Sequence, residues 1–235
     1  MRTRFAKTIC IATIAALALG CEGTTSGFLV TGATGNVRVR LLNALTSSTA
    51  VDFAVDGQVA SAGIVFGAAS PYVTVSTGSH RLQALASGTG TSLVDFTRDL
   101  NADGAFSLIP APGLSQFGAL FIADDPMRVT GQAKFRVVHV AAAPGPISVY
   151  ITSATADLTS ATPVVPTLSF GAASPSFAVA AGTYRIRVTP AGNPSTILLD
   201  TGSLIAGAGS VRTLLVTDAP GGGLPTTLSI VSDAN

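Results

Sequence analysis

The sequence predicts an all-β protein with two tandem immunoglobulin-like antiparallel β-sandwich domains after a lipoprotein signal peptide. Three observations support this fold class. The 235-residue chain has no Trp and only 11% charged residues, and it is rich in Gly, Ala, Ser, Thr and Val, a composition typical of short strands and tight turns. Apolar and polar residues alternate with a period of two. The string FGAASP occurs twice.

Residues 1–20 have the features of an export signal. Three basic residues precede an apolar stretch that is too short to span a bilayer, which takes ~20 residues. The stretch ends in LALGC, which resembles the lipobox of bacterial lipoproteins. We therefore expect cleavage after Gly20 and lipidation of Cys21. The alternative is an ordinary signal peptide with a chance cysteine.

Export would change the cysteine count and the charge of the chain. Cys10 would leave with the signal and Cys21 would carry lipid, so no thiol would remain for a disulfide, a metal site or a nucleophile. The chain has 13 Lys and Arg and 12 Asp and Glu. Loss of three basic residues brings the net charge to about −2. The remaining chain therefore lacks the basic patch that binding to nucleic acid requires.

The expected membrane contact is the acyl anchor, worth ~0.8 kcal/mol per buried CH₂. Glu22, the only Glu in the chain, follows the lipidated position. By resemblance to the sorting rule of some Gram-negative lipoproteins, this residue favours the outer membrane.

Residues 21–35 form the expected tether, and the first strand follows. In VRVR, Val37 and Val39 point to one side while Arg38 and Arg40 point to the other, so one face should be buried and the other wet. The preceding VTGATG resembles the dinucleotide loop of Rossmann-type oxidoreductases. Arg38 stands where the third glycine is needed, and a strand follows instead of a helix, so we expect no nicotinamide cofactor.

Self-similarity covers nearly all of the rest. FGAASP at Phe66–Pro71 recurs at Phe170–Pro175, an offset of 104 residues. Upstream, VRVRLLNA matches AKFRVVHV, and downstream LFIADDP matches LLVTDAP. Such a repeat predicts two copies of one domain, over residues 36–128 and 132–235.

Each copy is expected to contain several short strands. Turn signals such as VDG, STGS and SGTGT recur between β-branched runs. In the second copy, Tyr184, Ile186 and Val188 oppose Arg185 and Arg187. No stretch has helical periodicity. This pattern predicts an immunoglobulin-like sandwich, although the Cys and Trp residues of true immunoglobulin domains are missing.

The runs FRVVHV, VDFAVDG and FGAASPYVTVSTGSHRL resemble the domain of unknown function DUF4397, found in exported bacterial proteins, often as tandem copies. The resemblance covers most of residues 36–235. It implies the architecture and export but no reaction. The chain departs from the family at a His-Ala-Ser-Pro element, where the first copy has Asn43 and the second reads HVAAAPG, so a site shared there would be lost in both copies.

The string DLNADG spaces Asp99, Asn101 and Asp103 like the ligands that open a calcium loop, with Gly104 allowing the bend. Position twelve, where a bidentate Glu closes such a loop, is Pro110. The alternative is a polar hairpin turn between two strands. Ca²⁺ is therefore the one cofactor that the sequence leaves open.

Other catalytic signals are weak. His80 and His139 fall in different copies with no Glu or Cys nearby, so we expect strand or loop residues and neither zinc ligands nor a triad. Asp124 and Asp125 are adjacent at an expected domain end. The chain has no G-x-S-x-G or H-E-x-x-H motif, and nothing supports a glycosidase pair.

The sequence therefore predicts a non-enzymatic cell-envelope lipoprotein whose repeats serve a binding, structural or adhesion role toward an envelope protein or a polysaccharide. It leaves the oligomeric state open. The alternative is an exported calcium-dependent carbohydrate-binding protein, or a hydrolase accessory, that uses the DLNADG loop.

Overall fold

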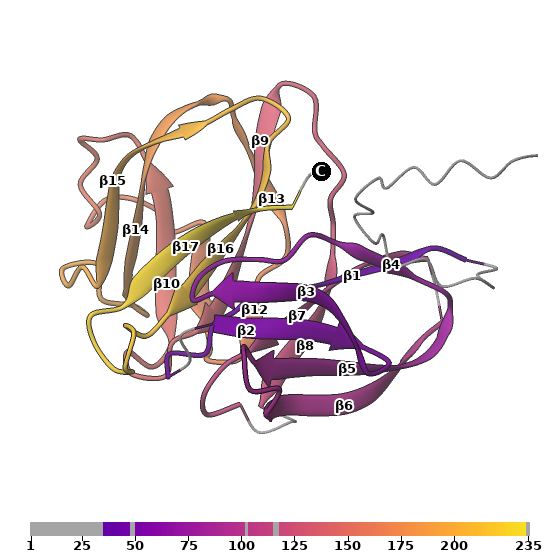
Figure 1. Ribbon diagram of the computed structural model, residues 1–235. Helices are drawn as coiled ribbons and strands as arrows, with labels where there is room; N and C mark the ends of the chain where they lie inside the picture. Colours follow the sequence, from indigo (N-terminus) through magenta and orange to yellow (C-terminus); the bar gives the residue numbers. More distant parts are fainter. Residues whose placement is uncertain (1–34, 48–49, 102, 115–117, 234–235) are drawn as a thin grey trace, which may run out of the picture.

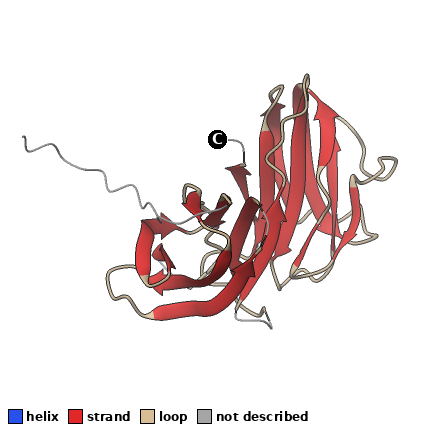
Figure 2. Ribbon diagram, turned by 90° about the vertical axis from the view of Figure 1, so that its right-hand side faces the viewer, coloured by secondary structure: helices blue, strands red, loops and turns tan. Residues whose placement is uncertain are grey.

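The computed structural model describes residues 35–47, 50–101, 103–114 and 118–233. Over these ranges it contains seventeen strands and no helix. Figure 2 colours the strands red and the loops tan. The predicted all-β class with β-sandwich architecture is confirmed. The described residues include no helix that is long and apolar enough to cross a membrane. Cys21 and the rest of the predicted signal and tether lie outside the described residues.

The first eight strands form two facing sheets. We call the sheet ordered β4-β1-β7-β8 the first joining sheet, and the sheet ordered β3-β2-β5-β6 the first outer sheet. Their bounds are β1 Val37–Leu41, β2 Ala50–Val55, β3 Gln58–Val65, β4 Val73–Val75, β5 Gly78–Ala86, β6 Ser92–Leu100, β7 Gly104–Pro110 and β8 Ala119–Asp124.

The remaining strands form a second such pair. The second joining sheet has the order β12-β9-β16-β17, with β13 also paired to β9, and the second outer sheet has the order β11-β10-β14-β15. Figures 1 and 2 show the two sandwiches side by side. Their bounds are β9 Gln132–Val140, β10 Ile147–Thr152, β11 Val165–Leu168, β12 Ala172–Ala173, β13 Phe177–Ala180, β14 Gly182–Pro190, β15 Leu199–Ala206, β16 Val211–Thr217 and β17 Thr227–Ser232.

The two sandwiches share one strand plan. β1 pairs with β7 in parallel, and β9 pairs with β16 in parallel, whereas the other ladders are antiparallel. Alternation along a strand does not reveal this, because it reports which face is buried and not the direction of the neighbour. The VDG signal does form the expected tight turn: Asp56 and Gly57, between β2 and β3, both have positive φ, as a two-residue hairpin loop requires.

Each sandwich has its own apolar core between its two sheets. Val39, Phe53 and Leu82 are fully buried in the first, and Val137 and Ile186 in the second. A third cluster lies between the sandwiches, where the two joining sheets face each other. Its buried members are Leu42, Ala44, Ile109, Ala111, Val138, Val140, Leu215 and Val231.

This third cluster corrects one expectation. The polar side of VRVR was predicted to be wet, but Arg40 is only 2% exposed. In β9, every residue from Ala133 to Val140 is buried. The reason is that the second face of each joining sheet, which a single sandwich would leave in water, is covered by the other sandwich.

Candidate functional site

The contact between the sandwiches contains a buried network of ionic side chains. The guanidinium of Arg40 donates from Nε to the Ser107 hydroxyl in its own sandwich, at 2.9 Å. Across the contact, Nη1 donates to the Ser232 carbonyl oxygen at 2.9 Å and Nη2 donates to Asp233 at 2.5 Å. Arg40 is therefore tied to the end of β17, the last strand of the second sandwich.

Arg136 of β9 repeats the arrangement in the opposite direction. Its Nε donates to the Thr213 hydroxyl of its own sandwich at 2.9 Å. Its Nη1 donates to the Ala123 carbonyl oxygen at 2.8 Å, and its Nη2 pairs with Asp124. Each sandwich thus supplies one arginine and one carboxylate to the other.

Both carboxylates are also held within their own sandwich. Ser107 donates to Asp124, and Thr213 donates to Asp233, each at 2.7 Å. Tyr72 adds a third donor to Asp124 at 2.7 Å, and its ring lies 4.6 Å from the Arg40 guanidinium carbon. Burial, followed by the charge of Asp124, raises the pKa of Tyr72. The phenol therefore stays a neutral donor, and the network works as a structural joint.

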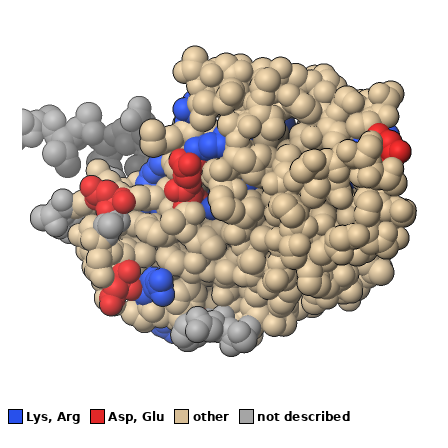
Figure 3. Space-filling model, turned by 180° about the vertical axis from the view of Figure 1, so that it is seen from behind, with Lys and Arg blue, Asp and Glu red and all other residues tan. Residues whose placement is uncertain are grey.

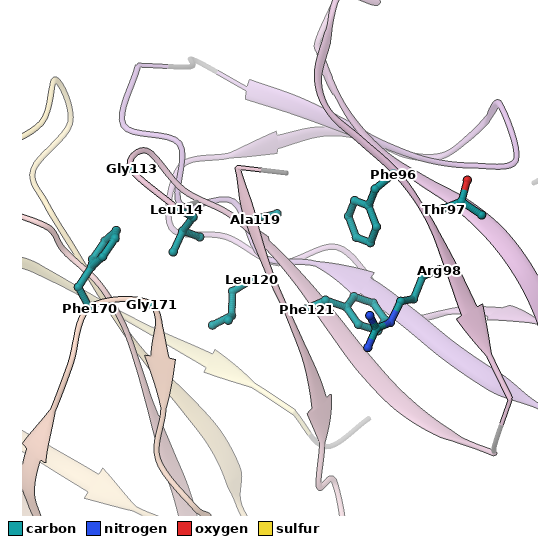
Figure 4. A pocket seen from close by; sticks show the side chains of 10 residues that line it. All are labelled: Phe96, Thr97, Arg98, Gly113, Leu114, Ala119, Leu120, Phe121, Phe170 and Gly171. Carbon is teal, nitrogen blue, oxygen red and sulfur yellow. The ribbon is translucent and has the colours of Figure 1, made fainter. Parts of the chain in front are cut away.

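A groove opens beside this joint and is lined by both sandwiches (Figure 4). Its volume is about 460 Å³. Three phenylalanines, two leucines and one arginine give it its chemical character: Phe96, Phe121, Phe170, Leu114, Leu120 and Arg98.

Phe121 of β8 is the centre of the aromatic cluster. Its ring stacks on Phe106 with a centroid distance of 5.3 Å and meets the edge of Phe96 at 6.2 Å. The guanidinium carbon of Arg98 stands 5.5 Å from the Phe121 centroid, which is the geometry of a cation–π contact. Because the side chain of Phe121 is only half-buried, the cluster is open to a ligand.

The second sandwich contributes Phe170 from the second FGAASP string. The ring lies against Gly113, where a Cβ atom would stand 3.5 Å from Phe170 Cζ. Gly113 also has a φ of +79°, a conformation that favours glycine. This backbone approach holds the far wall of the groove close to the first sandwich.

Arg98 is the one exposed cation of the groove. Arg81, on the neighbouring strand β5, is paired with Asp95 at 2.5 Å. Within the described ranges, by contrast, no carboxylate forms an ion pair with Arg98. On the face shown in Figure 3, charged residues occupy a few separate groups. The groove therefore offers aromatic surface together with an uncompensated positive charge.

The calcium candidates do not gather into a metal centre. Asp99 lies in β6, and Asp103 accepts a hydrogen bond from the Asn36 backbone N–H at 3.0 Å. In the part of the chain that the structure describes, no three His, Cys, Asp or Glu side chains are grouped to hold a metal. Asn101 is exposed, and residue 102 lies outside the described residues. The sequence predicts no metal, and calcium stays the alternative that it leaves open.

The alternative interpretation of DLNADG as a hairpin turn is wrong. β6 belongs to the first outer sheet and β7 to the first joining sheet, so the two strands are not neighbours. The segment crosses from one sheet to the other. Its Asn, Asp and Gly residues suit any tight reversal, and this composition cannot distinguish a hairpin from a crossing.

His80 has partners that the sequence did not indicate. Its Nδ1 lies 2.7 Å from Asp56 Oδ2, and its Nε2 lies 3.0 Å from the Ser76 carbonyl oxygen and 3.4 Å from the Ser76 hydroxyl. The three residue types are those of a hydrolytic triad. The closer carbonyl, however, needs a proton on Nε2, so that nitrogen cannot accept one from the serine.

His139 and Asn43 perform the same structural task in the two sandwiches. His139 Nδ1 accepts from Ala141 N–H, and its Nε2 lies 2.8 Å from the Gly145 carbonyl oxygen. Asn43 likewise accepts from the N–H two residues on and donates to a carbonyl oxygen of a neighbouring strand. Burial lowers the pKa of His139. His139 and Asn43, at the place of the His-Ala-Ser-Pro element, therefore hold loops in position.

The adjacent aspartates have separate roles. Asp124 belongs to the buried network, whereas Asp125 pairs with Lys134 at 2.8 Å. The hydrogen bond from Lys134 holds the pKa of Asp125 below its usual range. Neither carboxylate lines the groove.

No residue of the groove was predicted from the sequence to bind a ligand. Comparison of the two copies would have offered a signal, because the registers place Leu204 where the first copy has Arg98, and Ile230 where it has Phe121.

The family model described as Domain of unknown function (DUF4397) matches residues 37–150. The DUF4397 match runs from β1 into the second sandwich as far as β10. It therefore includes Arg40, Arg136 and Asp124 of the buried network, and all of the groove except its Phe170 wall. No curated protein matches the chain.

Three solved structures are similar at low identity. One is the family CBM26 module CBMbc from Eubacterium rectale Amy13K in complex with maltoheptaose, with a TM-score of 0.29 and 11% identity over 82% of this chain and 95% of that one. A putative adhesin from Bacteroides ovatus has a TM-score of 0.25 and 11% identity over 82% and 92%. The Bacillus anthracis TIE protein has a TM-score of 0.26 and 10% identity over 78% and 34%.

Proposed function

We propose that this protein is a non-enzymatic binding module of the bacterial cell envelope, anchored through lipidated Cys21, which takes its ligand in the groove between the two sandwiches. The observation that carries the proposal is the groove itself. Three phenylalanines from two sandwiches line it, and one of them, Phe121, lies under Arg98, which has no ionic partner among the described residues. A concave site with aromatic walls and few polar groups is the usual form of a ligand site.

The polar content of the groove favours binding over catalysis. Its described lining contains only Thr97 and Arg98 as polar side chains. General acid–base catalysis needs a group that exchanges protons near neutral pH, usually His or a carboxylate, and an arginine remains charged. Arg98 is therefore suited to hold a ligand and not to transform it.

A pair of matched substitutions tests the binding site. Purified full-length protein is screened against a glycan array and a peptide array, and each hit is measured again with Phe170→Ala and with Phe66→Ala. The two residues occupy the same place in the repeated FGAASP string, and both are half-buried. We expect Phe170→Ala to abolish binding and Phe66→Ala to leave it unchanged. Equal affinity of both variants, or no hit on either array, would refute the groove as the ligand site.

The anchor is tested separately from the groove. Cells that express the wild-type chain are grown with a radioactive fatty acid, and the protein is isolated by immunoprecipitation. We expect the label on the wild type and none on Cys21→Ala, because the thiol is the acylated group. An unlabelled wild type would rule out the lipid anchor. Fractionation of the envelope then checks the outer-membrane placement that Glu22 favours.

A further inference from the structure

The groove runs along an open sheet edge. β8 is the last strand of the first joining sheet and pairs only with β7. In an antiparallel strand, the N–H and C=O of alternate residues point to the same side. The Ala123 carbonyl oxygen accepts from Arg136, outside the sheet, whereas the Gly118 carbonyl oxygen accepts from Ala111 N–H, inside it.

This alternation fixes which backbone groups face the groove. Ala119 and Phe121 have the same parity as Ala123, so their N–H and C=O groups point away from β7. Among the described residues, no hydrogen bond outside the β7 ladder reaches these groups. The edge beside the groove therefore presents backbone donors and acceptors at the spacing of a β-ladder.

The side chains of the groove are divided between the two faces of β8. Leu120 packs toward the second sandwich, in the cluster that joins the sandwiches, whereas Phe121 packs toward the core of the first. Figure 4 shows Leu120 and Phe170 on one side of β8, and Phe121 with Arg98 on the other. Successive side chains of a strand laid against this edge would enter the two halves alternately.

The two halves differ in chemistry. One is apolar, formed by Leu114, Leu120 and Phe170, and the other carries the Arg98 guanidinium over an aromatic ring. An acidic side chain suits the second half, because it would form a charge-assisted hydrogen bond, and an apolar side chain suits the first.

We propose that the groove binds an extended segment of another protein, which pairs with β8 as an added strand and places an acidic side chain at Arg98 and the adjacent apolar side chain against Leu120 and Phe170. This inference rests on the proposed function and names its ligand class. Strand addition gains affinity from backbone hydrogen bonds and specificity from alternate side chains. A saccharide would find only Thr97 and Arg98 as polar side chains in the described lining.

The second sandwich provides an internal contrast. β17 is its corresponding edge strand, but Leu204 and Ile230 occupy the places of Arg98 and Phe121. The place of Arg98 therefore holds no cation in the second sandwich, and the nearby Arg212 guanidinium already donates to the Ile205 carbonyl oxygen at 3.0 Å. We therefore expect the acidic segment to bind at β8 and not at β17.

The test uses a library of short peptides that are capped at both ends. Two adjacent central positions carry every combination of residues, and the flanking positions are Ser and Thr. Binding to full-length protein is measured by fluorescence anisotropy. We expect the hits to pair an apolar residue with Asp or Glu. Replacing the acid by its amide should weaken binding about tenfold, as the loss of one charge-assisted hydrogen bond predicts.

Two further measurements separate the elements of the inference. Arg98→Gln should cause the same loss for the acidic peptide and none for the amide peptide, whereas Arg128→Gln, at an exposed arginine in the connection between the sandwiches, should change neither. N-methylation of the peptide N–H that faces the Phe121 carbonyl should abolish binding, and N-methylation of the next N–H, which points away, should not.

The outcomes distinguish this inference from the proposed function. Peptide hits that tolerate both N-methylations, or that ignore the charge at Arg98, overturn strand addition. If an acidic oligouronide binds and depends on Phe170 while no peptide binds, the peptide inference falls and the binding module stands. If neither class binds in a Phe170-dependent way, both fall.

Discussion

The two sandwiches have equivalent residues in the buried network that joins them, but different residues at the position of the groove. Arg40 and Arg136 each reach across to a carbonyl oxygen and a carboxylate at the end of the other sandwich's last strand. At equivalent positions nearer the start of these last strands, β8 of the first sandwich has Phe121 and β17 of the second has Ile230. The joint constrains both copies equally, because each arginine needs the other copy's carboxylate. The groove has no such reciprocal constraint, so one copy can carry a ligand site while the other does not.

The largest expected effect breaks the joint. Asp124→Asn removes the charge that faces Arg136 and leaves this buried guanidinium without a carboxylate, which costs about 3–5 kcal/mol of unfolding free energy. Asp233→Asn acts on the reciprocal half and should cost less, because Asp233 lacks the hydrogen bond that Tyr72 gives to Asp124. Urea denaturation of each variant measures the difference.

The control for this pair replaces both partners at once. Arg40→Met combined with Asp233→Leu removes a charge pair and leaves similar volume, so its free energy of unfolding should lie much closer to the wild type than that of Asp233→Asn. A double variant as unstable as the single one would contradict the interpretation that the stranded charge is what costs stability.

A smaller effect is expected at the paired glycines of the FGAASP strings. Gly67 and Gly171 both have a φ of +75°, so alanine at either should cost about 1–2 kcal/mol from backbone strain. Gly67→Ala should cost more, because its Cβ would lie 2.3 Å from Ser229 Oγ, whereas at Gly171 the nearest atom, of Leu114, is 3.0 Å away. Thermal or urea unfolding provides the comparison.

Removing the obstructing hydroxyl sharpens this comparison. In a Ser229→Ala background the costs of Gly67→Ala and Gly171→Ala should converge, since the remaining strain is the same. If the gap persists, the Ser229 hydroxyl is not its cause.

The smallest expected effect concerns His139 and Asn43. Burial lowers the pKa of His139 in the folded chain, so the unfolded chain binds the proton more readily. Stability should be full above the unfolded pKa of about 6.5 and should fall as the pH drops below it. His139→Asn, which copies the first sandwich, should reduce this loss between pH 7 and 5, as urea midpoints at each pH would record. An unchanged pH profile would exclude His139 as the source.

The strand class and the repeated plan followed from local sequence. Val37 and Val39 alternate with arginines, and the DG of VDG supplies two positive φ angles, because period-two burial and turn conformation depend on near neighbours. The site did not follow. Phe96, Phe121 and Phe170 lie far apart in the chain, and the DLNADG string next to Arg98 pointed to calcium and not to the arginine. Only their meeting at a sheet edge gives them a common role.

The sequence by itself determined that short strands with one apolar face would form two similar sandwiches, because alternation and turn residues act over a few positions. Only the tertiary structure determined that the second face of β1 and β9 is buried. Arg40 and Arg136 have the pattern of wet residues, yet they are buried, since the carboxylates that satisfy them come from the opposite sandwich. The same packing sets Phe170 against the open edge of β8 and creates the groove there.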